Sequence, residues 1–415
     1  MKRLIYFCNC LIRPAGYIDP FLVAEWPWLT AHFDRVDAVG ELGVAELPRE
    51  PVEALRFQKT RFAALRAALA LPFRGEVWAE TARLIRSGHA APGNILRLWR
   101  FAWRGLRMYE YAKPLLNGQD DVTLYSNWQS FDGYAAALCH HRRPSMPFVS
   151  RGHAFDVDVE RTPMNPWLMK RYIAREADGV WLISRTAYEQ YMSYMRGHVE
   201  ESRVHVLPVG SGGMPVDAVQ PPPRFANGVM HLVSCAAVLP IKQVPLLVEA
   251  LAQWQGMPVH WTHIGGGEGF DELCALADEK LSPMEHVVYD LKGPMNGQDV
   301  ARFYEDHPFD AFINTSRKEG VPVSIMEAMR WGVPVIAPAV GGIPDLVTKD
   351  IGFLYQPEEG AYGVLKRLEE LASLTEEETE RMRRSAWERW KHCCCSSALL
   401  PALFPEAAKK GGKGQ

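Results

Sequence analysis

The segment from Asn314 to Asp345, NTSRKEGVPVSIMEAMRWGVPVIAPAVGGIPD, restricts the possible folds of this chain more than any other stretch. Apolar runs of strand type lie at 310–314 and 333–337, on either side of a helical pattern. A strand, a turn, a helix and a second strand in this order are typical of a parallel α/β sheet. Open sheets of this kind bind ligands at the carboxyl ends of their strands, where the polar residues of the segment lie. The segment therefore predicts a binding site for an anionic group.

The length and composition of the chain predict two globular domains. Its 415 residues exceed the size that one hydrophobic core usually serves. Hydrophobic residues make up 47% of the chain and charged residues 23%, which is typical of a folded protein. The formal net charge of -3 gives no support for a nucleic-acid partner.

Strand and helix patterns alternate in both halves of the chain, which predicts an α/β protein with two Rossmann-like, doubly wound parallel sheets. Residues 211–228 are rich in glycine and proline and are interpreted as a linker. We expect an N-terminal, acceptor-binding domain at 1–212 and a C-terminal, nucleotide-sugar-binding domain at 213–385, facing each other across a cleft. Residues 386–415 are expected to form a helix that crosses back to the first domain and a polar tail.

The chain lacks the usual signals for secretion or membrane insertion. The apolar run near the N-terminus is interrupted by Asn9 and Arg13 and has no small-residue cleavage site. No run of ~18 uncharged apolar residues is present. The eight cysteines show no zinc-type spacing, and neighbours within Cys393–Cys395 cannot easily pair with one another. We expect reduced thiols and a cytoplasmic protein. Peripheral association with the inner face of the cytoplasmic membrane is a further prediction.

The turn and helix after Gly320 have the features of an anion site. The first N–H groups of a helix have no intrahelical partners and lie at the positive end of the helix dipole. Pro322 suits the first helical position because its missing N–H is not needed there. Ser324, in the first turn, adds a hydroxyl donor. A phosphate or diphosphate is the expected ligand.

Two glutamates accompany this helix. Glu327 lies three positions after Ser324, on the same helix face, where a carboxylate can accept hydrogen bonds from two neighbouring hydroxyls such as those of a ribose. Glu319 lies just before the helix, where it can contact a sugar or stabilise developing positive charge. For either residue taken alone, a solvated or ion-paired surface position is the alternative.

This spacing of glutamates, with its continuation at 340–342, resembles the E-x7-E signature of retaining family-4 glycosyltransferases of the GT-B fold, which bind their donor without a metal or cofactor. The segment SRGHAFD at 150–156 resembles the histidine-containing loop of members that build bacterial capsular polysaccharide, exopolysaccharide and lipopolysaccharide. Residues 233–242 and 263–265 match the C-terminal domain of that family in order. The resemblance extends over about 123–356 and is weak before it.

The resemblance implies a role for each matching residue. Glu319 would hold hydroxyls of the donor sugar, and Glu327 the ribose of the nucleotide. Lys242 would contact the diphosphate and offset charge on the leaving group. His153 would approach the donor sugar from the opposite domain. The other donor-binding positions that it implies are Gly16, Gly265, Gly320, Val321, Pro322 and Ser324.

One position departs from the pattern of this family, and one glycine cluster departs from the dinucleotide-binding pattern. Many relatives have an arginine six positions before the lysine, where this chain has Ala236, and Arg151 and Arg185 are the candidates to replace it. The glycine cluster 265–269 fails the dinucleotide-binding G-x-G-x-x-G test because Phe270 occupies the sixth position. We interpret the cluster as a strand-to-helix turn near the nucleotide.

A helix predicted at 94–113 carries a basic stripe formed by Arg97, Arg100, Arg104 and Arg107. Arginines on one helix face with tryptophans at the boundary are typical of binding to an anionic membrane surface. The alternative is an ordinary domain helix whose arginines face water and whose tryptophans lie in the core.

The sequence therefore predicts a retaining enzyme that moves a sugar from a nucleotide-diphosphate donor to a saccharide, lipid-linked or part of a surface polysaccharide. One alternative is an enzyme on the same fold similar to nucleotide-sugar 2-epimerases. Another is a non-catalytic protein that binds sugar nucleotides. The missing arginine at Ala236 favours this last alternative, whereas intact Glu319, Glu327 and Lys242 oppose it.

Overall fold

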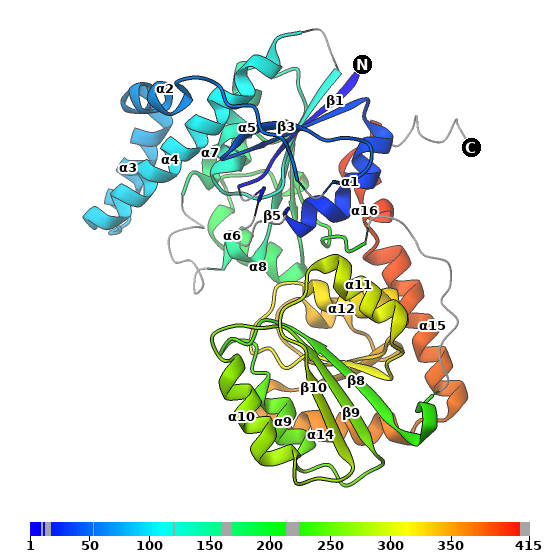
Figure 1. Cartoon of the computed structure of the whole chain (residues 1–415). Coiled ribbons are helices and arrows are strands. Elements are labelled where there is room, and N and C mark those ends of the chain that lie inside the picture. Colours follow the sequence, from blue (N-terminus) through cyan, green and yellow to red (C-terminus); the bar gives the residue numbers. More distant parts are fainter. Residues whose placement is uncertain are drawn as a thin grey trace. The chain divides into compact units, whose positions relative to one another are not determined.

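The computed structural model describes residues 1–9, 11–12, 18–52, 54–118, 121–158, 168–212 and 224–406. The chain divides into two compact units (Figure 1). Unit 1 comprises Met1–Pro208 and Leu399–Gln415, and unit 2 comprises Val209–Ala398. Each unit contains one β-sheet with helices packed against it.

Unit 1 is built on a seven-stranded sheet with the order β3-β2-β1-β4-β5-β6-β7. Its strands are β1 (Lys2–Phe7), β2 (Arg35–Gly40), β3 (Gly43–Glu46), β4 (Asp121–Ser126), β5 (Phe148–Gly152), β6 (Gly179–Leu182) and β7 (Val204–Val206). Neighbouring strands are parallel except at the edge, where β2 and β3 are antiparallel. This edge pair is antiparallel because the two residues between β2 and β3 permit only a hairpin.

Helices of unit 1 connect and cover these strands. They are α1 (Pro20–His32), α2 (Ala63–Ala70), α3 (Gly75–Arg86), α4 (Pro92–Ala112), α5 (Phe131–Arg142), α6 (Ala154–Val157), α7 (Lys170–Glu176) and α8 (Arg185–Met195), with short 3₁₀ helices η1 (Leu71–Phe73), η2 (Lys113–Leu116) and η3 (Glu201–Arg203). Helix α1 was not predicted, although its start is well defined. The side chain of Asp19 accepts a hydrogen bond from the Phe21 N–H at 2.9 Å, and Pro20 occupies the first helical position.

The end of the chain contributes to the core of unit 1. Helix α16 (Ser396–Leu403) places Leu400 and Leu403 in a buried cluster with β1, α1 and β2. Phe404 follows and makes edge-to-face contacts with Phe33 and Tyr125, at ring-centroid distances of 5.6 and 5.3 Å. Such contacts add to the stabilisation from burial of the rings.

Unit 2 contains a six-stranded sheet with the order β10-β9-β8-β11-β12-β13. Its strands are β8 (Met230–Cys235), β9 (Val259–Ile264), β10 (Val287–Leu291), β11 (Ala311–Ile313), β12 (Val335–Pro338) and β13 (Gly352–Tyr355), and all neighbours are parallel. This is the strand order of a dinucleotide-binding, doubly wound sheet. The predicted fold class is therefore confirmed for both units, apart from the edge hairpin of unit 1.

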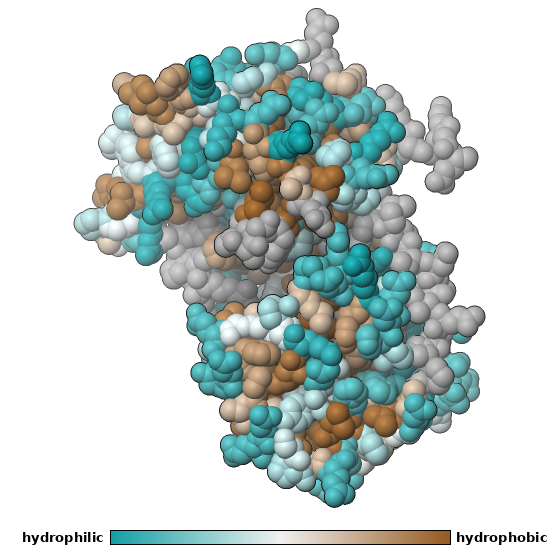
Figure 2. All heavy atoms as spheres, viewed as in Figure 1, coloured by the Kyte–Doolittle hydropathy of each residue, from teal (hydrophilic) through white to brown (hydrophobic). Residues whose placement is uncertain are grey.

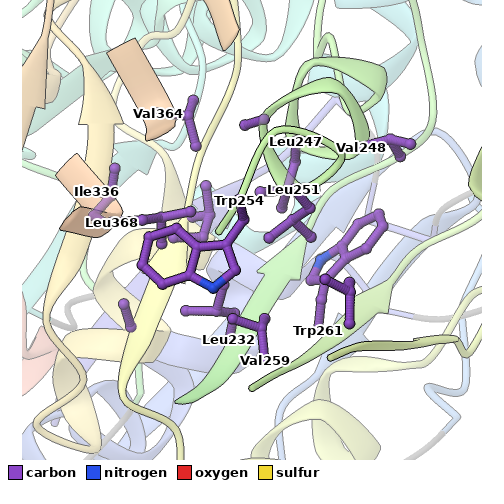
Figure 3. Packing of buried hydrophobic residues seen from close by; sticks show 14 of the residues in the cluster. Leu232, Leu247, Val248, Leu251, Trp254, Val259, Trp261, Ile336, Val364 and Leu368 are labelled. Atoms are coloured by element: carbon purple, nitrogen blue, oxygen red, sulfur yellow. The ribbon is translucent and has the colours of Figure 1, made fainter. Parts of the chain in front are cut away.

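Helices cover both faces of the unit 2 sheet. They are α9 (Pro245–Leu251), α10 (Phe270–Leu281), α11 (Gly297–Asp306), α12 (Val323–Arg330), α13 (Ile343–Leu346), α14 (Gly360–Ser373) and α15 (Glu376–Cys393), with η4 (Ala226–Gly228) and η5 (Pro357–Glu359). Successive strand residues point to opposite faces, so Leu232 joins the cluster under α9, α10 and α14 (Figure 3), whereas Val233 joins the cluster under α11, α12 and α15. The central strands of the sheet are therefore buried on both sides.

Helix α15 has a well-defined start at Thr375. The Thr375 hydroxyl accepts a hydrogen bond from the Glu378 N–H at 3.2 Å, and the Glu378 carboxylate accepts one from the Thr375 N–H at 2.8 Å. This reciprocal pair is a capping box. The helix packs in unit 2 with Ala386 and Trp390 buried in its core. The prediction that residues from 386 onward leave this domain is therefore wrong, and the segment that packs in unit 1 begins at Leu399.

Within the described ranges, no helix combines the length and the hydropathy needed to span a bilayer. The seven cysteines in these ranges are not in disulfides, and Cys394 and Cys395 are buried as apolar core residues.

The contribution of α16 can be tested by Leu400→Ala. We expect the substitution to destabilise unit 1 by about 2–5 kcal/mol, because truncation of a buried leucine leaves a cavity. Thermal unfolding followed by circular dichroism measures the effect. The matched control is Leu42→Ala, at a leucine that is 45% exposed, and an equal loss in both variants would contradict the packing described.

Candidate active site

The centre of the unit 2 sheet is the point at which the strand order reverses. Strands β8 and β11 are neighbours there, and the chain leaves them toward opposite sides of the sheet. Doubly wound sheets bind ligands outside the carboxyl ends of the strands at such a point. The loop 236–244 follows β8 and contains the predicted Lys242, and the loop 314–322 follows β11 and contains Glu319.

Two hydrogen bonds fix these loops to each other. The Thr315 hydroxyl donates to the Lys242 carbonyl oxygen at 2.9 Å, and the Arg317 N–H donates to the Ile241 carbonyl oxygen at 2.9 Å. Gln243, which follows Lys242, has a left-handed backbone with φ of 48°. The position of the Lys242 backbone is therefore set by the loop that carries the first glutamate.

The side chains of Lys242 and Glu319 form an ion pair. The Lys242 Nζ lies 2.5 Å from Glu319 Oε1, and the Ser316 hydroxyl donates to the same oxygen at 2.6 Å. The lysine side chain is 26% exposed and the glutamate side chain 7%. A cation and an anion therefore lie side by side at the switch point, with the lysine open to solvent.

Helix α12 begins at Val323, one residue later than predicted. Pro322 has φ of -73° and ψ of 116°, so it is the N-cap and not the first helical residue. The extended ψ follows from the turn that precedes the helix, and the Pro322 carbonyl already accepts from the Ile325 N–H at 3.2 Å. Proline has no side chain that can cap the helix, so the N–H groups of Val323 and Ser324 have no side-chain cap.

Glu327 is largely desolvated. Burial raises its pKa from 4.5 to about 7, although Arg330 lowers it in part. The charge of Glu327 in turn adds to the effect of burial on the pKa of Cys235, which rises to about 12. Glu327 also raises the pKa of Tyr304. Glu327 therefore lies close to the carboxyl end of β8, and it shares a helix face with Ser324.

Two glycines allow the loops of the site to approach each other. Gly341 has φ of 56°, and a Cβ there would lie 1.9 Å from the Glu319 carbonyl oxygen. Gly265 has φ of 147°, and a Cβ there would lie 1.9 Å from the Ala236 carbonyl oxygen. Both positions require glycine. The structure therefore explains Gly265 by packing against the β8 loop, and it gives Gly341 a positioning role that its place in the sequence motif did not specify.

His153 lies in unit 1, directly after β5. It is the N-cap of α6, and its N–H donates to the Asp156 carboxylate at 3.0 Å. Its ring stacks on Trp128 with centroids 4.1 Å apart and is 4.8 Å from the ring of Phe21. Asp156 is held in turn by the buried Lys170 at 3.2 Å. The imidazole therefore has a fixed orientation and is 3% exposed.

Both candidates for the missing arginine make their ion pairs within unit 1. Arg151 is buried in unit 1, where it contacts Glu25 at 3.0 Å and the Leu207 carbonyl oxygen at 3.1 Å. Arg185 pairs with Glu189 at 3.0 Å on the surface of α8. The predicted Gly16 lies outside the described residues. In unit 2, the exposed Arg317 follows β11 in the loop that is bonded to Ile241.

The basic stripe of α4 is only partly open to solvent. Arg104 and Arg107 both pair with Glu41, Arg107 at 2.6 Å. Arg104 also lies over the ring of Phe131, 3.8 Å from its centroid. The prediction that all four arginines form a membrane-binding face is therefore wrong for this pair, whose charges are used inside unit 1. Arg97 and Arg100 remain exposed.

Comparison with known proteins agrees with this fold. Residues 222–389 match the family model described as "Glycosyl transferases group 1". The chain is 28% identical over 211 residues to the putative colanic acid biosynthesis glycosyltransferase WcaL of Escherichia coli, covering 49% of each chain. It is 31% identical over 123 residues to the lipopolysaccharide 1,6-galactosyltransferase of the same organism, covering 28% of this chain and 32% of that protein. The chain thus spans half or less of the length of these curated relatives.

Among solved structures, Anabaena Alr3699/HepE in complex with UDP has a TM-score of 0.65 at 16% identity, and the match covers 99% of this chain and 100% of that one. The two Rossmann-like sheets define the GT-B class of fold. Within that class, residues 222–389 match the group 1 glycosyltransferases in sequence.

The half-buried Glu327 predicts a pH effect on stability. A carboxyl whose pKa is raised to about 7 in the folded state destabilises that state as the pH rises from 4.5 through 7, because the unfolded chain releases its proton first. Glu327→Gln removes this loss. We expect a melting temperature a few degrees above that of the wild type at pH 8 and no gain at pH 4.5.

Differential scanning fluorimetry across this pH range measures the difference. The control Glu285→Gln, at an exposed position before β10, should follow the wild type at every pH. An equal gain from Glu327→Gln at both ends of the range would contradict the role of ionisation.

Proposed function

We propose that the protein is a retaining glycosyltransferase that moves a sugar from a nucleotide-diphosphate donor to a saccharide acceptor. The observation that carries this proposal is the Lys242–Glu319 pair at the switch point of the unit 2 sheet, next to the N-terminus of α12. A cation beside free helix N–H groups suits a diphosphate, and a carboxylate beside it suits sugar hydroxyls. No additional group is required to hold such a donor.

We assign each donor part to a group in unit 2. The diphosphate contacts Lys242 and the N–H groups at the start of α12, with the Ser324 hydroxyl as a further donor. The Gly320–Pro322 turn sets the direction of that helix. Glu327, on the same helix face, accepts from the ribose hydroxyls. Glu319 accepts from hydroxyls of the transferred sugar, and Gly265 keeps the neighbouring loop close.

In this scheme, Lys242 and Glu319 exchange partners when the donor binds. Without donor, the ammonium and the carboxylate neutralise each other at 2.5 Å. The diphosphate then competes for the ammonium, and the sugar hydroxyls take its place beside the carboxylate. The pair keeps both side chains in position before the substrate arrives, which lowers the cost of organising the site.

The transfer itself forms a bond between the acceptor oxygen and the anomeric carbon, and breaks the bond from that carbon to the diphosphate. The proton of the acceptor hydroxyl passes to an oxygen of the leaving diphosphate on the same face of the sugar, which gives retention. Lys242 and the α12 N-terminus stabilise the charge that develops on the leaving group. We assign His153 to the sugar substrate. It lies directly after the carboxyl end of β5 in unit 1, and stacking on Trp128 fixes the orientation of its ring.

We propose that Arg317 supplies the charge that is missing at Ala236. Its backbone N–H is bonded to Ile241, the residue before Lys242, and its side chain is exposed. A long, flexible guanidinium anchored at this point can reach an anion held by the neighbouring lysine. Arg151 and Arg185 are already engaged in unit 1.

The acceptor is proposed to be a lipid-linked saccharide or part of a surface polysaccharide. The names of two relatives, a colanic acid biosynthesis glycosyltransferase and a lipopolysaccharide galactosyltransferase, support this class. The first donor to test is a UDP-sugar, since the similar Anabaena structure was solved with UDP. We place the reaction on the cytoplasmic side of the membrane, which agrees with the free cysteines in the described part of the chain.

Substitutions of the ion pair separate binding from chemistry. Glu319→Ala removes a negative charge next to the diphosphate, so UDP should bind at least as tightly as to the wild type, while turnover falls roughly 100-fold or more. Lys242→Ala should lose both UDP affinity and turnover. Glu327→Ala should mainly weaken UDP binding.

Isothermal titration with UDP and a coupled assay for released UDP give the two readouts. Glu285→Ala, at the opposite edge of the sheet, is the matched control and should behave like the wild type. Wild-type turnover in the Glu319 and Glu327 variants would refute the assignment of the site.

The role of Arg317 is tested by Arg317→Gln. We expect UDP affinity to fall roughly ten-fold, and the affinity of the variant to depend less on salt than that of the wild type, because one cation no longer contacts the diphosphate. Arg384→Gln, at an exposed arginine of α15, is the control. Equal affinities and equal salt dependence in the two variants would exclude Arg317.

The release assay also separates the proposal from its alternatives. A transferase releases UDP at a rate that depends on the saccharide acceptor. An epimerase-like enzyme consumes the donor without an acceptor, and a non-catalytic binding protein binds UDP with no release over a broad acceptor panel.

A further inference from the structure

A group of exposed apolar side chains lies in unit 1 on the part of the chain that forms α2, η1, α3 and the first half of α4. We call residues 59–104 the helical head. Of the 16 large hydrophobic side chains that are exposed in the described ranges, 7 lie between 62 and 96. Figure 2 shows brown spheres over α2 and beside α3. Such a concentration differs from the single, scattered apolar residues of an ordinary surface.

Helix α2 shows that this surface is not needed for the fold of the head. Ala63 and Ala67 are buried, and α2 packs on α4 through this small-residue face. Leu65 and Leu69 point to the opposite side, where they are 55% and 64% exposed. A surface helix usually presents polar residues on that side. The outer face of α2 is therefore suited to a contact outside the folded unit.

The apolar face extends beyond α2. Phe62 precedes the helix and is 66% exposed, and Phe73 of η1 is 87% exposed. Trp78 of α3, 51% exposed, packs edge to face on Trp99 of α4 with centroids 4.8 Å apart. Leu96, near the start of α4, is 70% exposed. Aromatic and aliphatic side chains of this kind prefer the boundary between water and lipid.

The helical head is strongly basic although the whole chain is acidic. Residues 59–104 contain nine lysines and arginines and two glutamates, a net charge of +7 from 9 - 2, against -3 for the chain. Both acids are neutralised locally, Glu76 by Arg74 and Glu80 by Arg83, each at 2.6 Å. The exposed cations that remain are Lys59, Arg61, Arg86, Arg97 and Arg100, whereas the exposed Arg66 lies 3.8 Å from the carboxylate of the buried Glu110.

We propose that the helical head binds the surface of an anionic lipid bilayer. The apolar side chains of α2 and η1 enter the headgroup region, and the exposed arginines contact lipid phosphates around them. An apolar face surrounded by positive charge matches a bilayer with negative headgroups, because both the buried area and the charge are complementary. The inference does not depend on the proposed transferase activity.

Vesicle flotation of the full chain without nucleotide sugar tests the proposal. The wild type should float with vesicles that contain phosphatidylglycerol, should float little with phosphatidylcholine alone, and should be released by high salt. Two variants are compared with it. They are the apolar variant Leu65→Ser/Leu69→Ser/Phe73→Ser and the charge variant Arg61→Gln/Arg86→Gln/Arg97→Gln/Arg100→Gln. Each should lower the bound fraction roughly ten-fold, because all of these side chains are exposed and their loss leaves the fold intact.

Matched controls carry the same kinds of change on exposed sites of unit 2. They are Leu239→Ser/Val288→Ser/Tyr362→Ser and Arg381→Gln/Arg384→Gln. These should float like the wild type. Failure of the wild type to float with anionic vesicles, or unchanged flotation of both head variants, overturns the proposal. A dimer in light scattering that the apolar variant converts to a monomer, with no flotation, assigns the face to a second copy of the chain and also overturns it.

Discussion

The site depends on the joining of two loops that are about 70 residues apart in the sequence. Hydrogen bonds from Thr315 and Arg317 to the backbone of the β8 loop hold that loop against the one that follows β11. Without them, Lys242 would be a surface lysine on a flexible turn and Glu319 an unpaired surface carboxylate. The reversal of strand order brings the loops together, because β8 and β11 are adjacent only in the sheet.

The two glutamates of the site have different electrostatic environments. The Glu319 carboxylate pairs with Lys242 and accepts a hydrogen bond from the Ser316 hydroxyl. Glu327 is desolvated at the end of β8, and its pKa of about 7 shows that the folded state tolerates an unfavourable charge there. A ligand that donates hydroxyl hydrogen bonds relieves this penalty. Carboxyl groups with shifted pKa values near strand ends are typical of functional sites, because such a shift does not stabilise the folded state.

Sequence reasoning found what depends on local pattern. The apolar runs at 310–314 and 333–337 predicted two neighbouring strands of unit 2, β11 and β12. It missed features that depend on partners. Arg104 and Arg107 have the spacing of a membrane-binding stripe, but both are held by the carboxylate of Glu41, some 60 residues earlier. The exposed leucines of α2 look like an ordinary amphipathic pattern until the buried face is shown to be the alanine face.

By itself, the sequence determined the alternation of strands and helices, the positions of Glu319 and Glu327, and the resemblance of the segment around them to a glycosyltransferase family. Helix periodicity and the turn at Gly320 are enough for this, because they act over a few residues. Tertiary structure decided that Lys242 pairs with Glu319, that Gly341 and Gly265 are required by close backbone contacts, and that Arg151 is occupied by Glu25. Contacts between distant segments are set by which strands become neighbours, and local sequence does not encode that order directly.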